Sequence, residues 1–144
     1  MQRNKLVRFI ILVFAAIGLP CLNLDATFKL VDTPAIRELP AKYTSGEILV
    51  ITINVNPFLP HGAKIIEKVP DGWDLVGANP PLSKQPFRNM YVWEIPSKGE
   101  ILKTIKYAVI IPKGNKSRKE FTGFVDIGKS VRLIVSGDRY IWGN

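Results

Sequence analysis

Several residues that could do chemistry lie around one turn of the sequence. Glu67, Asp71 and Asp74 flank Trp73, and carboxylates held in pairs beside the sugar are the groups that glycosidases use. The turn itself, Pro70–Gly72, has a structural explanation, because Pro presets φ, Asp bonds locally and Gly accepts positive φ. Turns and strand ends are also the usual places for acidic side chains. We therefore interpret these acids as structural and surface residues rather than as a catalytic pair.

Other catalytic and metal-binding patterns are missing from the sequence. His61 is the only histidine and Cys21 the only cysteine, which is too few for a His- and Cys-based metal site. There is no dense Asp loop for calcium, no G-x-S-x-G and no phosphate-cradling glycine loop before a helix. The sequence therefore predicts no catalytic residue, no metal and no cofactor. A small secreted hydrolase is the less favoured alternative.

Aromatic side chains offer a second kind of site, one that binds without chemistry. Trp73 follows a tight turn into a strand, where burial against an opposite sheet would remove roughly 200 Å² from water, and we favour that over a ligand platform. The stretch 84–91 interleaves cations with aromatic rings, which suits a polymer, although we favour a strand connection with Phe87 tucked beneath it. The candidate ligand contacts are Trp73, Phe87, Arg88, Tyr91 and Trp142.

The N-terminal residues 1–26 differ in kind from the rest. A start with three cations, MQRNKLVR, precedes eleven apolar residues, FIILVFAAIGL. These are the charged and apolar regions of a secretory signal, and the apolar run is short for a bilayer span. We expect cleavage after Leu24-Asp25-Ala26, with an uncleaved N-terminal anchor as the alternative. Lipidation of Cys21 is disfavoured by the preceding Leu19-Pro20, so the cysteine is expected to leave with the signal.

The net charge of +8 indicates the kind of partner that the protein favours. Residues 1–26 hold three cations and one acid, so residues 27–144 keep 17 Lys and Arg against 11 Asp and Glu, a net charge of +6. This surplus favours anionic surfaces such as acidic polysaccharide. The cations are scattered over the predicted strands, which argues against a nucleic-acid partner. The densest run, KGNKSRK at 113–119, is interpreted as a solvated loop.

A period of two in the hydrophobic pattern predicts β-strands throughout residues 27–144. Alternation is clearest in 47–55, in 100–111, where Ile101 is expected to share the inner face, and in 131–135, where Val131 is expected to do so. About seven to nine short strands, punctuated by Pro and Gly, indicate an all-β antiparallel sandwich of the immunoglobulin-like kind. The prolines in Thr33-Pro34 and Leu39-Pro40 suggest that the first strand breaks and continues at an edge. The predicted core includes Leu49, Ile51, Ile53, Tyr107, Val109, Leu133 and Val135.

The order of these motifs resembles a known kind of module. Arg37-Glu38-Leu39-Pro40 precedes Tyr43, Gly46, Glu67-Lys68-Val69-Pro70-Asp71-Gly72-Trp73, Trp93, Thr104-Ile105-Lys106-Tyr107, Pro112, Phe121-Thr122-Gly123 and Ser136-Gly137-Asp138. Over residues 34–140 this is similar to an Ig-like β-sandwich module of bacterial and archaeal secreted and cell-surface proteins, sometimes found beside dockerin or cohesin modules. The resemblance implies one sandwich domain and carries no catalytic residues with it.

The leading functional hypothesis is a non-catalytic interaction or structural module, secreted or displayed at the cell surface. Its partner is an unknown protein or polysaccharide, with anionic partners favoured, and the membrane is touched only through an uncleaved N-terminal segment. The alternative is a carbohydrate-binding module that uses exposed aromatics, drawn from Trp73, Tyr91, Trp93, Tyr140 and Trp142.

Removal of the signal predicts a mature N-terminus close to Thr27. Intact-mass analysis or N-terminal sequencing of exported material measures this directly. A product that retains Met1 would instead identify an N-terminal membrane anchor.

Overall fold

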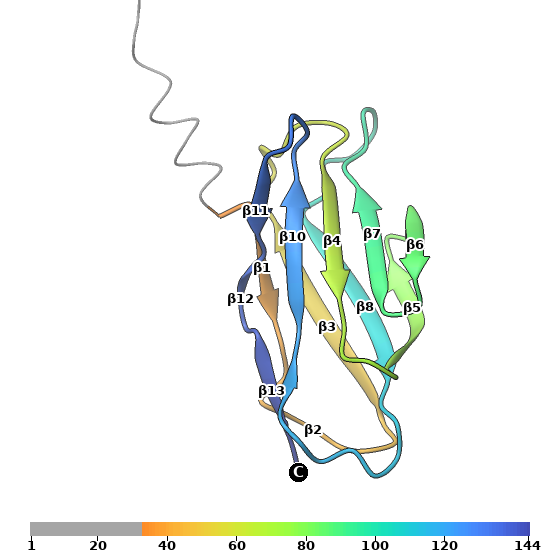
Figure 1. Ribbon diagram of the computed structural model, residues 1–144. Coiled ribbons are helices and arrows are strands. Elements are labelled where there is room, and N and C mark those ends of the chain that lie inside the picture. The colour runs from red at the N-terminus through yellow and green to blue at the C-terminus, as the bar shows by residue number, and fades with distance from the viewer. Residues whose placement is uncertain (1–32) are drawn as a thin grey trace, which may run out of the picture.

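The computed structural model of the chain describes residues 33–144, which form an all-β domain with two facing sheets (Figure 1). The expected cleavage site and Cys21 lie outside these residues, as does Phe28–Val31, a part of the stretch 27–144 for which the period-two pattern predicts strands. The first sheet has the order β12 (Ser136–Gly137), β1 (Ala35–Glu38), β3 (Ile48–Val55), β8 (Thr104–Ile110), β5 (Asp74–Asn79). The second has the order β11 (Arg132–Ile134), β10 (Thr122–Asp126), β4 (Lys64–Lys68), β7 (Met90–Glu94), β6 (Lys84–Phe87).

A small third sheet lies at the end of the sandwich where the chain finishes (Figure 1). It has the order β2 (Lys42–Tyr43), β13 (Tyr140–Gly143), β9 (Lys119–Glu120). Pairing between strands is antiparallel except for β1 with β12 and β2 with β13. The prediction of an all-β antiparallel sandwich is therefore confirmed within the described residues.

The period-two pattern places the core between the two large sheets. In β3 and β8 the alternate residues are buried, and the register sets Leu49 opposite Val109 and Ile51 opposite Tyr107. Facing side chains on the second sheet and its loops complete one cluster. The fully or nearly buried members named by the sequence pattern are Leu49, Ile51, Ile53, Tyr107, Val109 and Val135.

Three of the predicted inward positions differ in the structure. Leu133 is only half-buried and Val131 is 43% exposed, because β11 is a three-residue edge strand that pairs with β10 alone. Ile101 is 61% exposed because it lies in the loop before β8, which begins only at Thr104. Val131 and Ile101 lie just outside the strands, and Leu133 lies on an edge strand, so the alternating pattern alone does not bury them.

The first strand breaks where proline predicts. β1 pairs with β3 as far as Glu38, the chain then passes Pro40, and β2 joins the small sheet beside β13. Proline has no N–H for a strand ladder, so the break between β1 and β2, where no ladder is formed, suits it. The predicted interruption is confirmed, and it carries the chain from the first sheet to the small one.

A buried ion pair joins the two sheets through the middle of the core. Arg37 on β1 donates from Nε and Nη2 to the two carboxylate oxygens of Glu67 on β4, at 2.9 and 2.6 Å. Its Nη1 donates to the carbonyl oxygens of Phe121 and Asp138, at 3.3 and 2.8 Å. Arg37 is 2% exposed and Glu67 is fully buried. The guanidinium thus ties β1 to β4 and to the backbone on either side of β10–β12.

The remaining acceptor capacity of Glu67 is also used inside the core. The Tyr107 hydroxyl donates to Glu67 Oε2 at 3.1 Å. Burial raises the pKa of Glu67, while the bonds from Arg37 and Tyr107 act in the opposite direction. Gly123 leaves room for this arrangement, since a Cβ there would collide with Glu67 Oε1 and lie 3.0 Å from Arg37 Nη2. The interpretation of Glu67 as a turn acid is therefore wrong: it is a core residue of β4.

Trp73, which follows the Pro70–Gly72 turn, lies in the core. Its ring meets those of Tyr43 and Phe121 edge-on, with centroids 5.0 and 5.7 Å apart, and no part of it is exposed. Edge-to-face packing of this kind adds about 0.5–1.5 kcal/mol beyond area burial. The favoured structural interpretation of Trp73 is confirmed.

Breaking the buried pair is expected to destabilise the fold strongly. Glu67→Gln leaves the Arg37 charge uncompensated in the core, so the free energy of unfolding should fall by about 3–5 kcal/mol. The double variant Arg37→Met, Glu67→Leu removes both charges and should lose much less stability than the sum of the losses in Arg37→Met alone and Glu67→Leu alone. Urea unfolding followed by tryptophan fluorescence measures both. Losses that simply add would contradict the coupling, and Asp74→Asn, which breaks an exposed ion pair, is the control expected to change little.

Candidate ligand-binding surface

The structure separates the five candidate contact residues. Trp73 and Tyr91 are 0% exposed, so neither ring can stack on a ligand at the surface, and their assignment as contact residues is corrected. Tyr91 packs instead against Trp93 and Tyr107, with ring centroids 6.5 and 6.0 Å apart. Alternating positions of β7 that face the core explain the burial.

Phe87 and Arg88 lie at the turn between β6 and β7. Phe87 is 66% exposed, so the favoured interpretation of a ring tucked beneath the connection is wrong. Arg88 donates to both carboxylate oxygens of Asp74, at 2.6 and 2.5 Å, and these bonds lower the pKa of Asp74. The Arg88 guanidinium is therefore already bound to a carboxylate of the protein itself, that of Asp74.

Trp142 and Tyr140 form the exposed aromatic pair of the fold. They alternate with buried Ile141 on β13, so both point outward, 57% and 44% exposed. Trp93 is also among the aromatic residues of the predicted carbohydrate-binding alternative. It is 1% exposed, and its Nε1 donates to the Pro80 carbonyl oxygen at 3.0 Å. Of the three tryptophans, Trp142 alone is exposed.

Cations surround this aromatic pair on the small sheet. The Arg118 guanidinium carbon lies 4.5 Å from the Tyr140 ring centroid and 5.6 Å from that of Trp142. Arg139 lies 5.6 Å from the Tyr140 centroid, and Lys42 pairs with Trp142 across the β2–β13 ladder. We call this surface the aromatic–cationic ledge, formed by Lys42, Arg118, Arg139, Tyr140 and Trp142.

The ledge is held in place by the chain segment that supplies Arg118. The Lys113–Lys119 run packs on β13 so closely that a Cβ on Gly143 would lie 2.8 Å from the Cα and carbonyl oxygen of Lys116. Buried Tyr43 donates its hydroxyl hydrogen to the Ser117 carbonyl at 2.5 Å. Lys113, Lys116 and Arg118 are exposed, as expected of a solvated loop, whereas Lys119 is half-buried in β9, and the backbone of the run is fixed beside the aromatic pair.

The charges of the ledge are unequally neutralised. Arg139 is paired with Glu120, Nε to Oε1 at 2.6 Å. No carboxylate within residues 33–144 forms a salt bridge with Arg118 or Lys42. A guanidinium stacked on an aromatic face keeps its N–H edge free for a planar anion, and its geometry suits bidentate binding of a carboxylate or phosphate.

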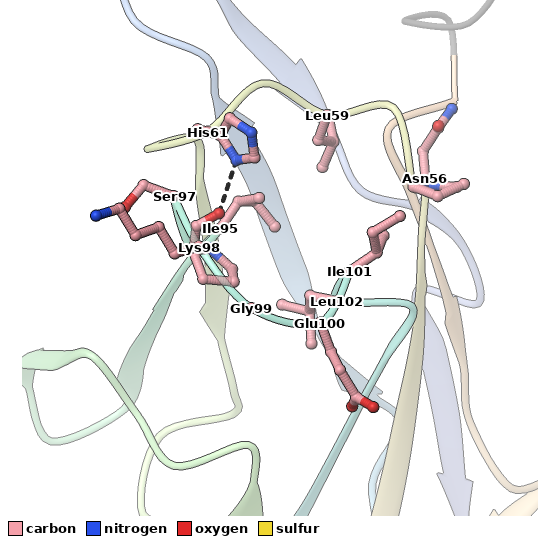
Figure 2. A pocket seen from close by; sticks show the side chains of 12 residues that line it. Asn56, Leu59, His61, Ile95, Ser97, Lys98, Gly99, Glu100, Ile101 and Leu102 are labelled. Carbon is pink, nitrogen blue, oxygen red and sulfur yellow. Dashed lines mark hydrogen bonds between the residues drawn. The ribbon is translucent and has the colours of Figure 1, made fainter.

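A small hollow lies at the end of the sandwich opposite the aromatic–cationic ledge. It encloses about 80 Å³ between the β3–β4 and β7–β8 loops, and Figure 2 shows His61 at its rim. His61 Nδ1 donates to the Pro96 carbonyl at 2.7 Å, and the Glu100 carboxylate points away from the imidazole (Figure 2). Within the described part of the chain, no three His, Cys, Asp or Glu side chains gather to hold a metal. This hollow offers His61 no acidic partner.

Comparison with known proteins identifies no relative from which a function could be inferred. No family model matches this chain, and no curated protein matches its sequence. No helix between residues 33 and 144 is long and apolar enough to cross a membrane.

The close approach of the Lys113–Lys119 run to Gly143 predicts that a side chain at position 143 disturbs the ledge. Gly143→Ala should push the run away from β13, uncover Trp142 and increase its quenching by iodide or acrylamide. Gly77→Ala is the matched control, because a Cβ there meets nothing within 4 Å. Hydrogen exchange of residues 113–119 should accelerate in the first variant alone. Unchanged quenching and exchange would show that the close approach does not order the run.

Proposed function

We propose that this chain is an exported, non-catalytic binding module whose aromatic–cationic ledge holds an acidic polysaccharide. One observation carries the proposal: Arg118, which forms no salt bridge within residues 33–144, is stacked on exposed Tyr140 beside exposed Trp142. An indole face packs on the apolar face of a sugar ring, and the guanidinium edge binds a carboxylate or sulfate on the same polymer.

Charge and rigidity support this ligand class. Lys42 adds a second cation opposite Trp142, and the net charge of residues 27–144 attracts a polyanion over the whole domain. The ledge is built on paired strands and on a backbone run fixed by Tyr43 and Gly143. Side chains held in place before binding lose less entropy when the ligand arrives, which raises affinity.

The positions of the acids support a binding role over a catalytic one. Glu67 is sealed in the core by Arg37 and Tyr107. Asp74 and Glu120 are each paired with an arginine. A glycosidase needs two carboxyl groups facing one sugar, about 5–10 Å apart across a cleft. Of the three acids around the Trp73 turn, Glu67 is buried and so cannot face a sugar, and Asp74 is held by Arg88.

The order of the strands supports an immunoglobulin-like relationship. In that fold, strands A-B-E-D face strands C-F-G. Here the spatial order β1-β3-β8-β5 faces β11-β10-β4, with β7 and β6 added beside β4. The chain forms β5 before the β6–β7 hairpin, so the sequential route differs while the spatial order corresponds. Together with the secretory-type N-terminus, this supports an extracytoplasmic module.

Affinity electrophoresis through gels that contain polygalacturonate or a neutral glucan tests the proposed ligand. We expect retardation by the acidic polymer that weakens steeply with salt, since the Debye length is only about 8 Å at physiological ionic strength. Arg118→Ala should lower the affinity about tenfold, as expected when a charge-assisted bond is lost together with a stacking contact.

Matched controls separate the ledge from general charge and aromaticity. Arg132→Ala removes the same charge and the same kind of stack, since Arg132 lies 4.8 Å over Phe124 on the second sheet, and should change retardation little. Trp142→Ala should weaken binding, whereas Phe87→Ala removes an equally exposed ring elsewhere and should not. Equal losses in ledge and control variants would refute the ledge. Salt-independent binding of the neutral glucan would favour the carbohydrate-binding alternative, and release of reducing sugar would overturn the non-catalytic assignment.

A further inference from the structure

The outer face of the first sheet carries an exposed apolar patch. Ile48 and Val50 on β3 are 57% and 54% exposed, and Ile110 on β8 is 44% exposed. The register sets Ile48 opposite Ile110 and Val50 opposite Ala108, so these side chains form two adjoining rows. Val76, at the bulge of neighbouring β5, is 54% exposed. We call this surface the outer patch.

This arrangement departs from the usual division of an antiparallel sheet into an apolar inner face and a polar outer face. The outer residues of β3 change character along the strand, from Ile48 and Val50 to Thr52 and Asn54. Scattered exposed apolar residues need no explanation, but contiguous ones that are rimmed by polar groups mark interaction surfaces. The outer patch has both properties.

Opposite charges stand in the polar row next to the outer patch. Thr52 on β3 pairs with Glu38 on β1 on one side and with Lys106 on β8 on the other. Adjacent strands lie about 4.8 Å apart, so the backbone positions of Glu38 and Lys106 are about 10 Å apart with β3 midway between them. Glu38 accepts a hydrogen bond from Asn54 Nδ2 at 2.6 Å, and neither charge forms a salt bridge within residues 33–144.

We propose that the outer patch is a symmetric interface with a second copy of this chain, with a two-fold axis along β3. Rotation about that axis lays β1 of each copy over β8 of the other, at the same level along the strands. Glu38 of each copy then faces Lys106 of the other, so the single two-fold rotation forms two intermolecular ion pairs. The same rotation packs Ile48 and Val50 against their own equivalents on the axis. Face-to-face packing of sheets at about 10 Å buries such residues.

Self-complementarity is the reason to choose a second copy over an unrelated partner. A two-fold interface requires each patch to match itself, and an acid and a cation equidistant from an apolar strand meet that requirement. The outer patch and the aromatic–cationic ledge lie on different sheets, so this inference does not depend on the proposed ligand.

A charge swap within one chain tests the interface by sedimentation velocity on the full chain. Glu38→Lys and Lys106→Glu should each place like charges together twice and weaken self-association at least about tenfold. The double variant Glu38→Lys, Lys106→Glu restores both pairs and should regain most of the lost affinity. An unrelated partner surface would not be restored in this way, so the rescue is specific to a second copy.

Apolar variants supply the second arm of the test. Val50→Lys on the outer patch should yield monomer, whereas Ile134→Lys, at an even more exposed apolar residue of β11, should leave self-association unchanged. Circular dichroism verifies that each variant keeps its strands. A wild-type chain that stays monomeric at every accessible concentration overturns the proposal, and so does a double variant no stronger than the single ones. Retardation by acidic polysaccharide reports on the ledge separately.

Discussion

The buried pair of Arg37 and Glu67 is the constraint on which the rest of the sandwich depends. A charge taken into an apolar core costs several kcal/mol unless its hydrogen-bonding groups are satisfied. Here the hydrogen bonds come from five places in the sequence: the side chains of Arg37, Glu67 and Tyr107, and the carbonyl oxygens of Phe121 and Asp138. Since these lie on different strands and loops, an assembly that shifts any one of them removes a hydrogen bond from the buried pair.

That requirement explains features of the chain that lie far apart. Gly123 is needed where β10 passes Glu67, because any side chain would occupy the carboxylate's position. The segment after β11 must return to β1 so that Asp138 can offer its carbonyl, and Asp138 Oδ2 also accepts from Leu39 N at 3.0 Å as β1 ends. The ion pair contributes specificity of arrangement in this way, while burial of Trp73, Tyr107 and the β3 aliphatics supplies the larger driving force.

How far the sequence predicts this structure depends on whether a signal is local. Alternation in β3 and β8, the break at Pro40 and the burial of Trp73 after its turn are all local patterns, and each is confirmed. Glu67 and its partner Arg37 are thirty positions apart, so the local sequence groups Glu67 with the neighbouring acids of the turn and gives no sign of the ion pair. Edge effects are equally nonlocal: Val131 alternates correctly but has little to pack against.

The ledge shows the same limit. The sequence offers Trp142 as a candidate ligand contact, but it predicts only a solvated loop for the run that contains Arg118. Its approach to Tyr140 depends on the β9–β13 pairing and on the missing side chain of Gly143, neither of which has a signature within the basic run itself.

The two proposed surfaces also reinforce each other physically. One ledge offers a single stacked guanidinium and a few exposed groups, which is enough for weak recognition of a polymer segment. Pairing through the outer patch leaves the small sheet uncovered in each copy, because that sheet lies at the end of the sandwich rather than on the outer face of the first sheet (Figure 1). A polymer long enough to reach both ledges then binds the second one intramolecularly, and its avidity rises without any new contact. The rigid core set by Arg37 and Glu67 fixes the ledge relative to the outer patch within each copy, and therefore the separation that such a polymer must span.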